Sequence, residues 1–151
     1  MTTILGPGEG RLFYIGGDQV TVKGVADLPG GGFALIDYSA APGVPGPPLH
    51  VHDAIDEAWY LLEGRLDVQV GDDRRHVGAG DFLLVPHGAP HTFANAGTER
   101  ARWIGVLSPG TALTMLEDLG HLIPERGTPD EDAIIDMFQR YGTTVLGPPL
   151  S

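Results

Sequence analysis

Glycine and proline are spread along this chain and divide it into short segments. Together they account for 36 of its 151 residues and follow no repeating period. Proline interrupts helices and inner sheet strands, and glycine is the residue that the tightest turns favour. A chain interrupted so often cannot form long helices over most of its length. We therefore expect many short strands joined by tight turns, in one domain of ordinary size.

Runs of β-branched, aromatic and other apolar residues lie between these turns. The expected strands are residues 11–15, 19–25, 33–39, 49–52, 57–62, 66–70, 74–77, 81–85, 91–94 and 101–107. Such a succession of short strands is typical of a sandwich or a barrel. The connector at residues 41–48 contains four prolines, whose missing N–H groups keep it out of the centre of a sheet.

The last third of the chain changes to helical patterns. Leucines recur at helical spacing between Leu113 and Gly120, which predicts a first helix. Residues 128–131 have the pattern of a capping box with Pro129 at the first helical position, which predicts a second helix over 129–141. We expect the apolar face of this second helix to pack on the β domain or on a partner subunit.

The charge and cysteine content exclude several classes of function. The chain has nine basic and 20 acidic residues, a net charge of −11, and no cysteine. Binding to nucleic acid or to an anionic membrane surface needs a basic face, so we expect neither partner. Disulfides, thiolate nucleophiles and iron–sulfur clusters are excluded as well. Because no secretory signal or membrane-spanning run is visible, we expect a soluble, cytoplasmic protein.

Three of the six histidines and one glutamate form the pattern that carries chemistry. His50 and His52 are two residues apart in an expected strand, so their imidazoles point to the same face. Glu57 and His91 each begin another expected strand. Three neutral imidazoles and a carboxylate suit one divalent Fe, Ni, Mn, Co or Zn ion. They also leave two positions of an octahedron open, as a catalytic metal requires.

These residues belong to two spaced motifs. The first begins at Gly43 or Gly46 and continues as His50-x-His52-x4-Glu57-x6-Gly64, and the second is Gly80-x5-Pro86-x-Gly88-x2-His91-x3-Asn95. In this order and spacing they resemble the two motifs of the cupin superfamily, within residues 43–95. The resemblance implies an all-β fold, a single jelly-roll β-barrel over residues 11–110, with a metal inside its mouth. Residues 1–10 would then be an N-terminal arm, and residues 111–151 a short helical flank and tail.

Two positions in the motifs leave a choice open or assign a supporting role. Asp56 lies one residue from the expected ligand position, but the six-residue spacing to Gly64 and the place of Glu57 in the strand favour Glu57. We expect Asn95 to order the backbone around it, because short amides bond readily to nearby main-chain groups.

A substrate pocket would need apolar walls above the metal. Trp59 lies two residues after Glu57, and Phe93 two residues after His91, so each shares the face of a ligand. These two aromatics are our candidates for the pocket. Of the other histidines, we expect His76 and His121 at the surface or behind the ligands, and His87 in the turn before His91.

The resemblance implies a metal-dependent enzyme, with a dioxygenase of the quercetinase-like group as the first hypothesis. Glu57 would then act as catalytic base as well as ligand, and take a proton from an enol or phenol. A second hypothesis is an oxygen-independent isomerase, lyase or cyclase, and a third is a non-enzymatic small-molecule-binding cupin. With one lysine, Lys23, the chain favours a neutral or weakly acidic substrate over a dianionic one. Small cupins are commonly homodimers, and we expect one here.

Overall fold

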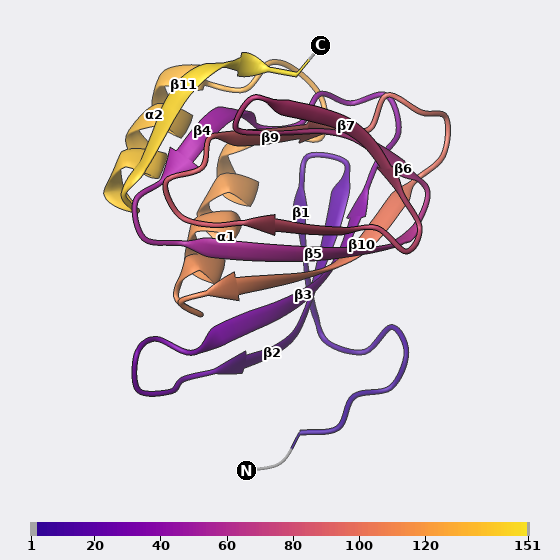
Figure 1. Cartoon of the computed structure of the whole chain (residues 1–151), viewed down its shortest axis with the longest axis vertical. Helices are drawn as coiled ribbons and strands as arrows, with labels where there is room; N and C mark the ends of the chain where they lie inside the picture. Colours follow the sequence, from indigo (N-terminus) through magenta and orange to yellow (C-terminus); the bar gives the residue numbers. More distant parts are fainter. Residues whose placement is uncertain (1–2, 151) are drawn as a thin grey trace.

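The computed structural model describes residues 3–150, most of which lie in or between short strands (Figure 1). The elements are β1 (Arg11–Ile15), β2 (Asp18–Ala26), β3 (Phe33–Ala40), β4 (Pro48–His52), β5 (Asp56–Glu63), β6 (Arg65–Val70), β7 (Asp73–Gly78), β8 (Phe82–Val85), β9 (His91–Ala94), β10 (Ala101–Ser108), α1 (Ala112–Leu122), α2 (Glu131–Arg140) and β11 (Thr143–Pro149). Each strand expected from the sequence is present, and its ends differ from the expected ones by at most one residue.

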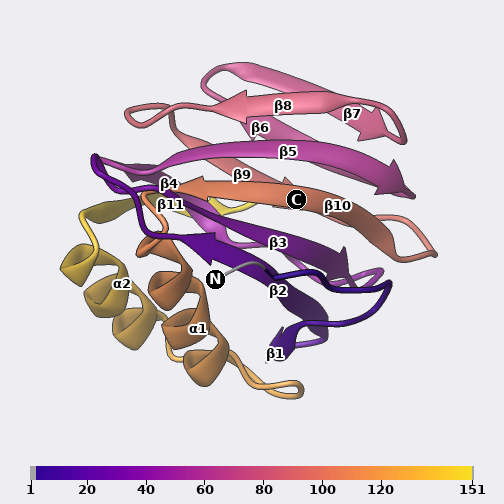
Figure 2. The ribbon, with the colours of Figure 1, turned by 90° about the horizontal axis from the view of Figure 1, so that it is seen from below.

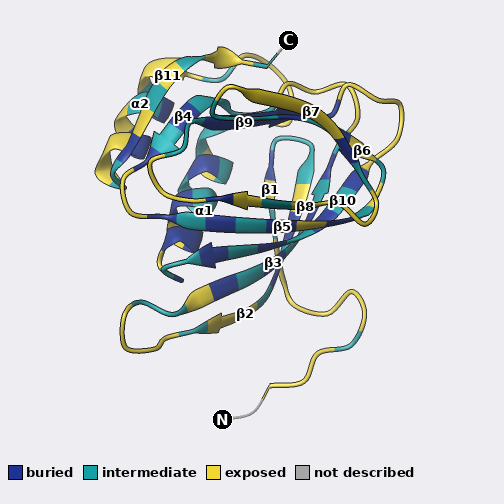
Figure 3. Cartoon of the chain, in the orientation of Figure 1, coloured by how far each residue is buried: buried dark blue, intermediate teal, exposed yellow. Residues whose placement is uncertain are grey.

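Two antiparallel sheets face each other and form the expected jelly roll (Figures 1 and 2). One sheet has the order β1-β2-β3-β10-β5-β8, and the other has the order β11-β4-β9-β6-β7. Buried and partly exposed residues alternate along β10 without exception, because one face of that strand looks into the space between the sheets. Buried residues recur along most of the other strands as well (Figure 3).

Aromatic rings fill the centre of the sandwich. The ring of Trp103 stacks on Tyr38 at a centroid distance of 4.3 Å and on Trp59 at 5.0 Å. Phe93 meets Trp59 and Trp103 edge to face. These pairings bury large apolar rings at the distances that aromatic pairs prefer.

Helices α1 and α2 pack against each other and close one side of the sandwich, between β1 and β11 (Figure 2). The expected cap of α2 was wrong. Its N-cap is Asp130, whose Oδ1 accepts from the N–H of Ala133 at 3.1 Å, and the helix begins at Glu131. Aspartate caps a helix at least as well as threonine, so the helix starts after Pro129 rather than at it.

The C-terminal segment returns to the sheet as β11, which no sequence pattern predicted. It pairs with β4 so that Thr143 lies opposite His52 and Val145 opposite His50. The register shifts at Gly147 and Pro149. A strand with prolines is tolerated here because β11 is at the edge of its sheet.

The segment before β1 lies outside the sheets, as expected of an arm (Figure 1). Lys23 holds part of it, because its Nζ donates to the carbonyl of Glu9 at 2.6 Å and to that of Gly6 at 3.3 Å. Residues 1 and 2 of the expected arm, and residue 151 of the tail, lie outside the described residues. Over residues 3–150, neither helix has the length and apolar character needed to cross a membrane.

Candidate metal centre

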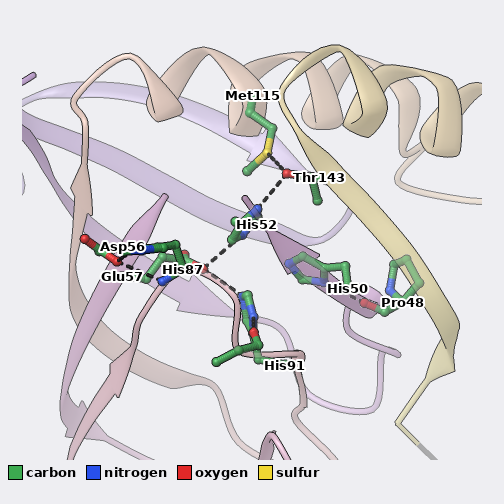
Figure 4. A network of polar contacts seen from close by, with 10 residues as sticks. Pro48, His50, His52, Asp56, Glu57, His87, His91, Met115 and Thr143 are labelled. Carbon is green, nitrogen blue, oxygen red and sulfur yellow. Dashed lines mark hydrogen bonds and ion pairs between the residues drawn. The ribbon is translucent and has the colours of Figure 1, made fainter. Parts of the chain in front are cut away.

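Three neighbouring strands bring the four predicted ligands together (Figure 4). His50 and His52 come from β4, Glu57 from β5 and His91 from β9, where His91 lies directly opposite His50. All four are buried, with exposed fractions between 2% and 8%. One ligand atom from each of the three histidines lies within 4.8 Å of the other two. His50, His52 and His91 therefore form a group that could hold a metal ion.

The loops that position these strands depend on close backbone approaches and tight turns. A Cβ on Gly46 would lie 1.7 Å from the carbonyl oxygen of Phe93, so only glycine lets the proline-rich connector cross β9 there. Gly88 has a φ of 80° in the turn before His91, and its N–H donates to the carbonyl of His52 at 2.8 Å. The turn between β8 and β9 is thereby fixed to the end of β4.

Asn95 orders the backbone, as expected. Its Nδ2 donates to the carbonyls of Ala40 and Glu99, and its Oδ1 accepts from the N–H of Gly97. Together these bonds tie the end of β9 to β3 and to the loop before β10.

The Nδ1 atoms of the three histidines are bonded on the outer side of the group. Nδ1 of His50 lies 2.7 Å from the carbonyl of Pro48, and Nδ1 of His91 lies 3.0 Å from that of Ala89. A carbonyl can only accept, so both Nδ1 atoms carry a proton and donate it. Nδ1 of His52 lies 2.6 Å from Oγ1 of Thr143 instead. This outer bonding leaves the Nε2 atoms for whatever lies at the centre.

On the inner side of the group, the hydrogen bonds that can form leave one ring nitrogen without a partner among the described residues. Oε2 of Glu57 accepts from Nε2 of His91 at 2.8 Å. Nε2 of His52 is 3.3 Å from the same oxygen, and among the described residues it has no hydrogen-bond partner. A buried polar nitrogen without a partner is costly in a folded protein. A cation at the centre would satisfy it.

The pKa values of these groups reflect burial and mutual contact. Burial, with the charges of His91 and His52, lowers the pKa of His50 to about 3, so this imidazole is neutral. Burial alone would raise the pKa of Glu57, but its contacts with His52 and His91 outweigh burial and hold it far below its usual range. Burial would lower the pKa of His91, and its hydrogen bond to Glu57 raises it instead.

The donor set fits a metal ion. His50 offers a neutral imidazole nitrogen, His52 offers a ring nitrogen without a hydrogen-bond partner among the described residues, and Glu57 offers an ionised carboxylate. Oε2 of Glu57 accepts from Nε2 of His91, so the proton of this hydrogen bond lies where an ion would bind. A divalent ion binding to this set would displace that proton, as metals do when they bind protonated ligands.

The remaining predicted residues lie elsewhere. Asp56 is half exposed and accepts from the N–H and from Nδ1 of His87, at 2.8 and 2.7 Å, so it is separate from the histidine group. His76 is exposed and bonds to Asp67. His121 lies in the last turn of α1. Of the two acidic residues, the structure thus places Glu57 beside the three histidines, and Asp56 outside.

Trp59 and Phe93 lie in the buried centre of the sandwich, with exposed fractions of 7% and 8%. Each comes from the same strand face as a predicted ligand. A cleft of about 440 Å³ opens between the edge strands β7 and β8, and neither aromatic lines it. Its lining residues are Val68, Val70, Asp73, Arg75, His76, Val77, Asp81, Phe82, Leu83 and Leu84. The assignment of Trp59 and Phe93 to a substrate pocket therefore stays a prediction.

Three residues near the histidines were missed by the sequence reasoning. Thr143 in β11 bonds to Nδ1 of His52, and its hydroxyl donates to Sδ of Met115 in α1 at 3.6 Å. The ring of Phe138 in α2 stacks on His50 at a centroid distance of 5.5 Å. Each lies at least 63 positions after His52 in the sequence, and no spacing rule links these residues to that histidine.

Comparison with known proteins identifies relatives of the central region. The family model described as Cupin domain matches residues 37–107. The chain is 28% identical over 133 residues to quercetin 2,3-dioxygenase of Bacillus subtilis, a match covering 88% of this chain and 37% of that protein. It is 34% identical over 83 residues to polyketide synthase CurC of Streptomyces cyaneus, covering 55% of this chain and 52% of that one. The matches thus span about half or less of these curated relatives.

A solved structure shares the fold. An RmlC-like cupin from Shewanella frigidimarina superposes with a TM-score of 0.62 at 20% sequence identity. The superposition covers 73% of this chain and 93% of that one.

Proposed function

Because the chain is a member of the cupin superfamily, we propose that it is a metal-dependent dioxygenase acting on a small enolic or phenolic compound. The observation that carries the proposal is the buried set of three imidazoles and one carboxylate, in which Nε2 of His52 has no hydrogen-bond partner among residues 3–150. A merely structural polar cluster would satisfy that nitrogen within the protein.

In this proposal His50, His52, Glu57 and His91 hold one divalent Fe, Ni, Mn, Co or Zn ion per chain. The bound ion would supply a Lewis acid that favours the deprotonated form of a substrate hydroxyl. The histidines are preorganised for this role, because the outer bonds of their Nδ1 atoms fix the ring orientations.

Glu57 is the proposed catalytic base. Its carboxylate is ionised at neutral pH, and Oε2 is the atom that would accept a proton from a substrate hydroxyl placed beside it. In the metal-free protein Nε2 of His91 donates to that oxygen at 2.8 Å, and a bound ion would take the place of the donated proton. Trp59 and Phe93, on the neighbouring inward positions of β5 and β9, are the proposed apolar wall for a substrate ring.

The relatives support the reaction and the substrate class. The relative named as a quercetin 2,3-dioxygenase supports an oxygen-dependent reaction, and the one named as a polyketide synthase supports a phenolic or polyketide-like substrate. The buried aromatic centre and the scarcity of lysine favour an apolar, weakly acidic compound over a dianionic one.

Elemental analysis tests the metal site. Untagged wild-type protein should contain about one transition-metal ion per chain, and His50→Ala and His91→Ala should contain almost none. His76→Ala is the matched control, because this histidine is exposed, bonds to Asp67 outside the histidine group and should retain the metal. A wild-type protein that stays metal-free after reconstitution would contradict the proposal and leave a binding cupin without catalysis.

Oxygen consumption tests the reaction. Phenols and enols supplied to the metal-loaded protein should be consumed together with dioxygen, and the reaction should stop in an anaerobic sample. Equal turnover with and without dioxygen would replace the dioxygenase by an isomerase, lyase or cyclase at the same site. A homodimer and a cytoplasmic location stay predictions.

A further inference from the structure

We infer that Thr143 is a positioning residue that fixes the tautomer of His52, so that the C-terminal strand completes the metal centre. Thr143 lies 91 positions after His52 in the sequence and outside the region that matches the cupin domain. The consequence for metal binding rests on the proposed function, whereas the tautomer of His52 does not.

The fold places the two side chains against each other at a fixed position. Thr143 is the first residue of β11 and lies directly opposite His52 on β4. The pairing is reinforced one residue further on, where the N–H of Asp53 donates to the carbonyl of Gly142 at 2.9 Å. Both side chains are almost fully buried, with exposed fractions of 1% and 2%. No bulk water therefore competes for their polar atoms.

Counting protons assigns the direction of the bond between them. A threonine hydroxyl has one proton, and that of Thr143 points to Sδ of Met115 at 3.6 Å. Oγ1 must then act as acceptor toward Nδ1 of His52, 2.6 Å away. The Nδ1 atom therefore carries the proton of the neutral imidazole, and Nε2 carries the lone pair.

The opposite tautomer would leave a donor without an acceptor. A proton on Nε2 of His52 would be buried, and Oε2 of Glu57, 3.3 Å away, lies outside hydrogen-bond geometry. The same oxygen already accepts from Nε2 of His91 at 2.8 Å. The surroundings of both ring nitrogens thus favour the tautomer that presents a free lone pair to the centre of the histidine group.

The tautomer of His52 is fixed in a different way from the tautomers of His50 and His91. His50 and His91 donate to the carbonyls of residues two positions earlier in the chain, and a carbonyl enforces the tautomer by itself. A hydroxyl can either donate or accept, so the pair Thr143 and Met115 is needed to enforce it at His52. The sulfur is a weak acceptor, but it is the partner that takes the hydroxyl proton.

Nuclear magnetic resonance of metal-free protein labelled with ¹⁵N-histidine tests the inference directly. At a pH where the imidazole is neutral, wild type and Thr143→Ser should both show His52 protonated on Nδ1. Thr143→Val, which has nearly the same shape and no hydroxyl, should shift His52 toward protonation on Nε2. A wild-type His52 protonated on Nε2, or a Thr143→Val variant that keeps the Nδ1 tautomer, would overturn it.

Zinc titration then measures the consequence. Thr143→Val should bind Zn²⁺ about 10–100-fold more weakly than wild type, as is typical when a partner of a metal ligand is lost, and Thr143→Ser should stay within about threefold. Equal affinity of Thr143→Val and wild type would overturn the role in metal binding. If wild type itself bound no zinc, the proposed metal site would be wrong. The tautomer of His52 in wild type and in Thr143→Val would still test whether Thr143 fixes that tautomer.

Met115→Leu gives a second test should the valine variant unfold. The leucine keeps the apolar packing on α1 but removes the sulfur, so the Thr143 hydroxyl becomes free to donate to Nδ1. His52 should then move toward the Nε2 tautomer, with a loss of zinc affinity smaller than that of Thr143→Val. An unchanged tautomer in a folded Met115→Leu variant would contradict the proton assignment.

Discussion

The region of the two motifs and the C-terminal region contribute differently to the same site. Residues 43–95 supply all four predicted ligands, and two of the histidines are oriented by carbonyls of the same region. The region from α1 to β11 supplies no ligand, yet Thr143 holds the third histidine and Phe138 stacks on His50. The identity of the ligands is thus a local property of the sequence, whereas their orientation depends in part on the folded C-terminal region.

Of the changes that test how the two regions depend on each other, removing the ring of Phe138 should have the largest effect. The side chain is 1% exposed and packs against the His50 ring, so Phe138→Ala should lower the free energy of unfolding by about 3–5 kcal/mol, as measured by urea denaturation. Metal affinity should fall as well, because His50 loses its packing partner. Phe138→Leu should cost less on both counts. A loss below about 1 kcal/mol for the alanine variant would show that the two regions are independent.

Adding and removing the metal should come next in size. Since the ligands come from three strands that meet only in the folded chain, zinc at 100 times its Kd should raise the free energy of unfolding by about 2.7 kcal/mol. A chelator should reverse the gain, and His50→Ala should not respond. Hydrogen exchange should slow in β11 as well as in β4. If hydrogen exchange slowed only in β4 and β9, the stability of the C-terminal strand would not be coupled to metal binding.

Two glycines at close backbone contacts, one in each region, should separate stability from binding. A Cβ would lie 1.7 Å from the Phe93 carbonyl in Gly46→Ala and 2.4 Å from the Tyr14 carbonyl in Gly120→Ala. Each variant should lose about 1–3 kcal/mol of unfolding free energy. Only Gly46→Ala should also weaken metal binding, because it displaces β9. Gly24→Ala, with nothing within 4 Å, is the control and should change neither.

The smallest effect should come from the tie between the two helices. The hydroxyl of Tyr141 donates to Asp118, and this hydrogen bond, with burial, raises the pKa of Tyr141. A raised pKa means that the folded state holds the proton more tightly. The stabilisation is therefore complete below the ordinary value near 10 and is lost as pH rises through the higher folded value. Near neutral pH the free energy of unfolding of wild type should exceed that of Tyr141→Phe by less than about 1 kcal/mol. This difference in unfolding free energy, measured by urea denaturation, should narrow above pH 10. A constant gap would contradict the assignment.

Most of the sheet framework and all four candidate ligands were predictable because their signals are short-range. Runs of β-branched, aromatic and other apolar residues between glycine and proline turns marked the strands. The spacing from His50 to Gly64 and from Gly80 to Asn95 marked the candidate ligands. The choice of Glu57 over Asp56 also rested on local spacing, and the structure brings Glu57 to the histidines.

The supporting residues could not be predicted, because their roles arise from contacts distant in sequence. Thr143 lies in a tail whose glycine and prolines suggested no strand, and it becomes one only by pairing with β4. The helix cap was placed at the wrong residue because both Thr128 and Asp130 can cap, and it is Asp130 that accepts from the N–H of Ala133. Trp59 and Phe93 have the predicted face, but their place in the aromatic centre depends on Tyr38 and Trp103, which come from other strands.

The pairing of β11 with β4 makes the end of the chain a regulator of the proposed site by thermodynamic linkage. If docking of the last strand strengthens metal binding by some factor, bound metal must strengthen the docking of that strand by the same factor. An event that competes for residues 143–149, such as clipping by a protease or pairing with another chain's edge, would then appear as a change in metal affinity. Conversely, the extent of metal loading could be read from how strongly the chain resists digestion at its C-terminal end.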